Sequence, residues 1–72
     1  MSTRIKVNLK EDVLREWLCV NNMQHKDFAK NMRMNAKFFS QLLSGFRHPG
    51  IESRLKILKE TKFKFEDIFY IE

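Results

Sequence analysis

Residues 25–45, HKDFAKNMRMNAKFFSQLLSG, contain two short helical patterns. In each pattern, 25–32 and 36–44, apolar residues recur three or four positions apart, which is the spacing of one helix face. Only three residues separate the two patterns, so there is room for a tight turn and nothing longer. Asn35 stands immediately before the second pattern, and asparagine is a good helix N-cap. We therefore predict two short helices joined by a tight turn.

The apolar positions also predict how these two helices meet. The small side chain of Ala29 lets the second helix cross the first closely, and Met34 fills the turn between them. The side chains expected to face inward are Phe28, Ala29 and Met32 from the first helix, and Phe39, Leu42 and Leu43 from the second. This is the helix-turn-helix arrangement, about residues 25–44, in which the second helix is presented to the major groove of DNA.

Positive charge is concentrated in the same part of the chain. Residues 24–50 carry five basic side chains and a single acidic one, a local charge of +4 in a chain whose net charge is +5. Such a concentration favours a polyanionic partner, most simply nucleic acid. Charge alone is equally typical of a solvated surface, so the functional hypothesis depends on the motif as well.

The remaining sequence predicts three more helices, over residues 10–20, 52–61 and 65–68. The residues expected inside are Leu14, Trp17 and Leu18 in the first of these, and Leu55 and Leu58 in the second. The segment SGFRHPG, residues 44–50, is rich in glycine and proline, which predicts a loop.

The two ends of the chain predict a pair of strands. Ile5, Val7 and Leu9 alternate with polar residues, and Phe69 and Ile71 alternate in the same way. Because a lone strand leaves its backbone groups unpaired, we expect residues 4–8 to pair antiparallel with residues 69–72. The predicted fold class is therefore mainly all-α, one domain over residues 1–72 with five helices and a short two-stranded ribbon.

Composition favours a folded intracellular protein. The chain is 43% hydrophobic and includes seven Phe, one Trp and one Tyr, which a disordered chain would not carry. Cys19 is alone and no apolar run approaches transmembrane length, so we expect a cytoplasmic location and no membrane partner. His25, His48 and Cys19 lack the paired spacing of metal ligands. Ser40 and Ser44 suggest no nucleophile with its base, so we expect no enzyme, no metal and no cofactor.

Six consecutive segments together resemble the Cro/C1-type (XRE) helix-turn-helix family of phage and bacterial regulators. In order they are LREWLCVNN, MQHKDFAKNM, NAKFFSQLLSG, GFRHP, IESRLKILKET and FEDIF, and they cover nearly the whole chain. The resemblance implies the five-helix lambda-repressor-like fold. It also implies a sequence-specific transcriptional regulator, a repressor of phage or bacterial type that is associated with the nucleoid.

Four positions depart from the family pattern. Arg33 stands in the turn where the family usually has glycine, and a left-handed non-glycine residue costs on the order of 1 kcal/mol. Gln24 replaces the usual Ser or Thr cap, although Asp27 is placed to accept a hydrogen bond from the Gln24 backbone, as in a capping box. Arg54 occupies an apolar position, and Lys62 follows the fourth helix where glycine is expected. These departures predict modest stability.

The resemblance and the helix geometry together direct the polar side chains of residues 36–44 toward DNA. Those expected to contact base edges are Ala36, Lys37, Ser40 and Gln41. Those expected to contact phosphates are Gln24, His25, Arg33, Asn35, Arg47 and His48. Gln41 suits adenine, Lys37 reaches guanine, and Ala36 touches a thymine methyl group. The same side chains also fit an ordinary solvated helix face.

A DNA reader of this size makes few contacts, so we expect a homodimer on a two-fold operator of double-stranded DNA. The surfaces expected for self-association are the terminal strands and the aromatic side chains of Phe63, Phe65, Phe69 and Tyr70. The alternative hypothesis is a protein-interaction module, such as an antirepressor or an antitoxin-like binder, that keeps the fold without reading an operator. Phe38, expected to be partly buried, and Phe46 favour this alternative mildly.

Overall fold

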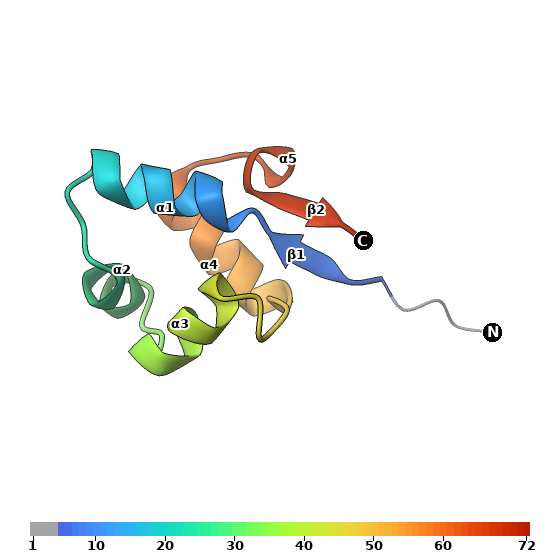
Figure 1. Cartoon of the computed structure of the whole chain (residues 1–72), viewed down its shortest axis with the longest axis horizontal. Helices are drawn as coiled ribbons and strands as arrows, with labels where there is room; N and C mark the ends of the chain where they lie inside the picture. The colour runs from blue at the N-terminus through green and yellow to red at the C-terminus, as the bar shows by residue number, and fades with distance from the viewer. Residues whose placement is uncertain (1–4) are drawn as a thin grey trace.

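The computed structural model describes residues 5–72. Within them the chain forms five helices and a two-stranded sheet (Figure 1). The elements are β1 (Val7–Leu9), α1 (Glu11–Val20), α2 (His25–Asn31), α3 (Ala36–Leu43), α4 (Ile51–Thr61), α5 (Phe65–Ile68) and β2 (Phe69–Ile71). The predicted mainly helical class and the five predicted helices are confirmed, each boundary within about one residue.

The predicted antiparallel pairing of the two end segments is present, but β1 covers Val7–Leu9 where residues 4–8 were expected. β1 and β2 are antiparallel, with Asn8 opposite Tyr70, and Figure 1 shows this ribbon extending from one side of the helices. The ladder continues at both ends: the Glu72 N–H donates to the Lys6 carbonyl at 2.9 Å, and the Lys10 N–H donates to the Ile68 carbonyl at 2.8 Å. Arg4, which the prediction included, lies outside the described residues.

Phe28 lies at the centre of the hydrophobic core. Its ring is fully buried, with its centroid 5.4 Å from that of Trp17 and 5.2 Å from that of Phe39. The other side chains that were expected inside and are buried are Leu14, Leu18, Ala29, Met32, Phe39, Leu42 and Leu43. Trp17 is only half-buried and packs against the edge of this core.

The inward face of α4 differs from the prediction. Leu55, expected inside, is 62% exposed, Leu58 is half-buried, and Ile57 is fully buried instead. Two faces of this helix could turn toward the core. One carries Leu55 and Leu58, and the other carries Ile57 between the polar residues Arg54 and Thr61. In the structure those polar groups are bonded to the backbone of α4 and its N-cap, because Thr61 Oγ1 donates to the Ile57 carbonyl at 2.8 Å and Arg54 Nε to the Gly50 carbonyl at 3.2 Å. Their stripe can therefore face the core.

Two further predictions were wrong. Phe69, expected on a self-association surface, is 1% exposed and belongs to the core, since its ring packs against Phe65 with centroids 5.4 Å apart. The capping box expected at Gln24 and Asp27 is also missing, because α2 begins without a side-chain cap. A reciprocal bond of this kind occurs at α5, where the Lys64 N–H donates to Asp67 Oδ2 at 3.0 Å.

Over residues 5–72, no helix combines the length and the apolar character that crossing a membrane requires.

Candidate nucleic-acid interface

The turn between α2 and α3 fixes how α3 is held. Arg33 adopts the left-handed conformation, with φ 54°, as predicted for a position where glycine is usual. The Met34 N–H donates to the Ala29 carbonyl at 2.8 Å, which closes the turn, and the Met34 side chain is half-buried against the core. Ala29 is fully buried, so α3 can approach α2 closely while Phe28 and Phe39 pack together. One face of α3 is therefore fixed to the core and the other is left outside.

Asn35 caps α3 as predicted. Its Oδ1 accepts hydrogen bonds from the backbone N–H groups of Lys37 at 2.8 Å and Phe38 at 3.3 Å. These bonds satisfy two of the free donors of the first turn. With Oδ1 engaged by the backbone, the exposed Asn35 side chain still carries its amide N–H donors, and those suit a phosphate oxygen.

The four residues predicted to contact bases lie together on the outer part of α3. Ala36, Lys37 and Ser40 are exposed, and Gln41 is half-buried. The opposite side of the helix, with Phe39, Leu42 and Leu43, is buried in the core. The exposed side thus combines one cation, one hydroxyl, one amide and one methyl group, which are the chemical groups used to recognise base edges.

The loop after α3 folds back onto the helix at Gln41. Gly45, with φ 82°, reverses the chain, and the Gln41 carbonyl then accepts from the N–H groups of Phe46 at 3.0 Å and Arg47 at 3.2 Å. The two side chains meet as well, since Arg47 Nε donates to Gln41 Oε1 at 2.5 Å. The Arg47 guanidinium also lies over the ring of half-buried Phe38, 5.6 Å from its centroid.

Sequence analysis missed this cluster. It assigned Gln41 to bases and Arg47 to phosphates as independent contacts, whereas the structure bonds them to each other. Five residues lie between the two positions, and a loop containing both glycine and proline gave no indication of where its side chains would lie. Gly45 is the one local signal, because a glycine after a helix permits the left-handed reversal.

The predicted phosphate contacts fall into separate places. Gln24 and His25 lie at the start of α2, where the His25 ring packs edge-on against Phe39 of α3 with centroids 6.1 Å apart, so this corner of α2 lies beside α3. Arg33 instead lines a hollow with Lys56 and Lys59 of α4. His48 is exposed in the loop, which the buried Pro49 anchors. The structure therefore places His25 beside the middle of α3, Asn35 at its N-terminus and Arg47 near its C-terminus.

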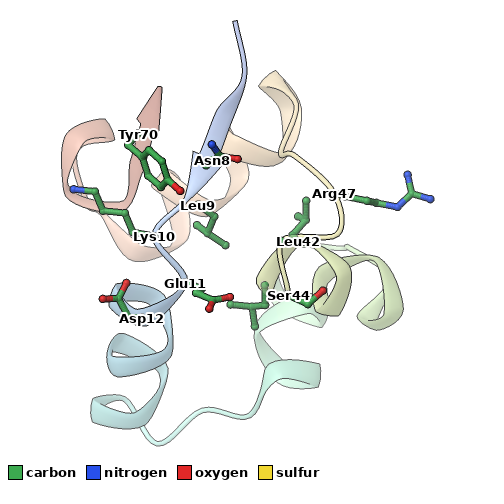
Figure 2. A pocket seen from close by; sticks show the side chains of 11 residues that line it. Asn8, Leu9, Lys10, Glu11, Asp12, Leu42, Ser44, Arg47 and Tyr70 are labelled. Atoms are coloured by element: carbon green, nitrogen blue, oxygen red, sulfur yellow. The ribbon is translucent and has the colours of Figure 1, made fainter. Parts of the chain in front are cut away.

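A second feature beside α3 is a hollow of about 330 Å³ between β1, the start of α1 and the end of α3. Figure 2 shows Lys10, Glu11 and Asp12 on one side of it and Ser44 across it, with the Arg47 guanidinium pointing away. Lys10 is engaged, since its Nζ donates to the Glu66 carbonyl at 2.9 Å. The two carboxylates make this hollow a poor site for a polyanion.

Among residues 5–72, no three His, Cys, Asp or Glu side chains gather closely enough to hold a metal ion. No family model, curated protein or solved structure matches the chain. Its function is therefore inferred from the residues and contacts described above.

Proposed function

We propose that the chain is a sequence-specific DNA-binding transcriptional regulator of the Cro/C1 type, with α2 and α3 as its helix-turn-helix and α3 in the major groove. The observation that carries this proposal is how α3 is held and which of its side chains are exposed. Its N-terminus is capped by Asn35, its apolar face is fixed against α2, and its polar face is exposed. A rigid helix with an exposed polar face is what base recognition in the major groove requires.

Charge supports the same function. The side chains of Lys26, Lys30 and Lys37 are all exposed on α2 and α3, and Arg47 is exposed in the loop after α3. Each phosphate that a lysine or arginine neutralises releases condensed counterions, which makes binding dependent on salt concentration. Gln24 and His25 at the start of α2, and Asn35 at the cap of α3, add side-chain hydrogen-bond donors that suit phosphate oxygens.

We propose that the protein acts as a homodimer on a two-fold operator, because one module of this size makes few base contacts. Ile51 and Leu55, with Leu58 and Phe65, line an apolar hollow on the outside of α4 and α5. Phe63 is half-buried and Tyr70 is 48% exposed, so both remain candidates for self-association, whereas Phe69 does not.

The exposed apolar side chains also favour a second candidate function. Phe46 is 77% exposed, and Ile51 and Leu55 are exposed nearby in the sequence. A surface of this kind suits a protein partner, as in an antirepressor or an antitoxin-like binder. In that case α3 would be a surface for protein contacts.

Fluorescence anisotropy with a random DNA duplex at two salt concentrations separates the two candidates. A DNA-binding protein should bind at low salt and lose affinity steeply as salt rises. Selection of bound sites from a random DNA library should then enrich a sequence with two-fold symmetry. That sequence serves as the operator in all later measurements. Absence of binding at both salt concentrations, with the protein folded, would reject the DNA-binding function and leave the protein-interaction module.

A further inference from the structure

We infer that Arg47 fixes the side-chain amide of Gln41 with its N–H₂ group toward DNA, so that this position of α3 recognises a base edge that offers a hydrogen-bond acceptor. The inference rests on the proposed function and deepens it, because it names a specificity-determining pair and the class of base that the pair selects. Arg47 acts here as a positioning residue, and Gln41 makes the base contact.

The donor and acceptor chemistry of the two side chains determines the orientation. A guanidinium group has only donors, and a glutamine amide has a carbonyl oxygen at one end and an N–H₂ group at the other. Arg47 Nε lies 2.5 Å from Gln41 Oε1, and turning the amide over would place two donors against each other. Arg47 therefore holds Oε1 toward itself and leaves Nε2 on the side away from it.

Arg47 is itself held from two other directions. Its backbone N–H donates to the Gln41 carbonyl at 3.2 Å, so the same two residues are joined through main chain and side chain. Its guanidinium lies over the Phe38 ring, 5.6 Å from the centroid. Phe38 and Gln41 are both half-buried, which limits the rotamers open to them. The Gln41 amide is thus oriented before any DNA arrives.

An oriented amide selects bases differently from a free one. A free glutamine pairs with adenine through one donor and one acceptor. With Oε1 engaged by a charged donor, Gln41 presents N–H groups, and these match guanine, whose O6 and N7 are both acceptors, or thymine O4. Adenine offers the N7 acceptor beside an N6 donor for which the engaged Oε1 is no longer free, so it is disfavoured. The cytosine N4 amine is a donor and is rejected. The base pair facing Gln41 should therefore place guanine or thymine opposite its amide.

The experiment first identifies the base pair at which the Gln41→Ala protein no longer distinguishes the four bases. It then measures the affinity of each protein for the selected operator and for the three operators that differ only at that pair. The parent protein should prefer guanine or thymine there by about 5- to 150-fold, the range of a good base contact. Arg47→Ala should abolish most of that preference. It should also raise the relative affinity for the operator variant with adenine at this pair, and leave the preferences at all other base pairs unchanged. The double variant should be as indifferent at that pair as Gln41→Ala alone, because removing Arg47 has no further effect on a base contact that Gln41 no longer makes.

Two further variants separate orientation from charge. Arg47→Lys keeps the charge, but a lysine has no planar donor group that can lie flat on Phe38. This variant should therefore keep its affinity for random duplex within about twofold and lose the preference for guanine or thymine at the Gln41 pair. Lys26→Ala removes one exposed charge of α2 and leaves the Gln41–Arg47 pair intact, so it should weaken all four operator variants by the same factor. Circular dichroism establishes that each variant is folded.

The possible results distinguish this inference from the function on which it rests. If Arg47→Ala weakens all four operator variants equally, as Lys26→Ala does, Arg47 is a phosphate contact and the inference is wrong while the DNA-binding function stands. An adenine preference in the parent that persists in Arg47→Ala also overturns it. If the folded parent binds no duplex, the proposed function and this inference both fail.

Discussion

Arg47 and Gln41 are joined twice, once between their side chains and once between their backbones. Nε donates to Oε1 at 2.5 Å, and the Arg47 N–H donates to the Gln41 carbonyl at 3.2 Å. The loop after α3 is consequently part of the same rigid unit as the helix. A substitution at Arg47 therefore changes the orientation of the Gln41 side chain as well as the charge of the surface.

Asn35→Ala should lower the free energy of unfolding by about 1 kcal/mol, because the Lys37 and Phe38 N–H groups lose their acceptor. Chemical denaturation measures the change. Asn35→Asp keeps a side-chain oxygen at the cap and should retain most of the stability. Equal losses in the two variants would show that the cap bonds contribute little.

Phe28→Ala should destabilise the protein by about 3–5 kcal/mol, because the ring is fully buried between Trp17 and Phe39. Trp17→Ala should cost clearly less, since Trp17 is only half-buried. Thermal unfolding followed by circular dichroism ranks the two variants. A greater loss for Trp17→Ala would contradict the assignment of Phe28 to the centre of the core.

Leu55 and Ile57 provide a matched test of which side of α4 faces inward. Ile57→Ala should cost about 2–5 kcal/mol in unfolding free energy, because the side chain is fully buried. Leu55→Ala removes an exposed side chain and should change it by less than about 0.5 kcal/mol at concentrations where the protein is monomeric. The opposite ranking would restore the orientation of α4 that the sequence predicts.

Lys62→Gly should stabilise the protein by about 1 kcal/mol. Lys62 ends α4 in the left-handed conformation, with φ 63°, where a side chain is strained and glycine is not. Lys62→Ala keeps the strain and serves as the control, so its melting temperature should stay near that of the parent. A glycine variant no more stable than the alanine variant would indicate that Lys62 makes a compensating contact.

Local signals in the sequence were sufficient for the elements and for the α2–α3 crossing. Helix periodicity, the Asn35 cap and the left-handed position of Arg33 each depend on residues within one or two turns. The pairing of the chain ends was also predictable, because alternating apolar residues at both termini leave each strand only one partner of matching length.

Contacts between distant residues decided the rest. On α4 the sequence contains two competing stripes, and the stripe with Ile57 faces inward because Ile57 joins the core cluster with Leu14 of α1 and Phe28 of α2. The buried position of Phe69 follows in the same way, because Phe69 pairs with Leu9 of β1 and joins the same core cluster.

The amino-acid sequence by itself determined which segments are helices, that Asn35 caps α3, and which side of α3 is polar, because these properties depend on neighbouring residues. Only the tertiary structure decided that Arg47 lies on Phe38 and orients Gln41. That contact requires the chain reversal at Gly45 and one specific pairing of side-chain rotamers, which no periodic pattern encodes.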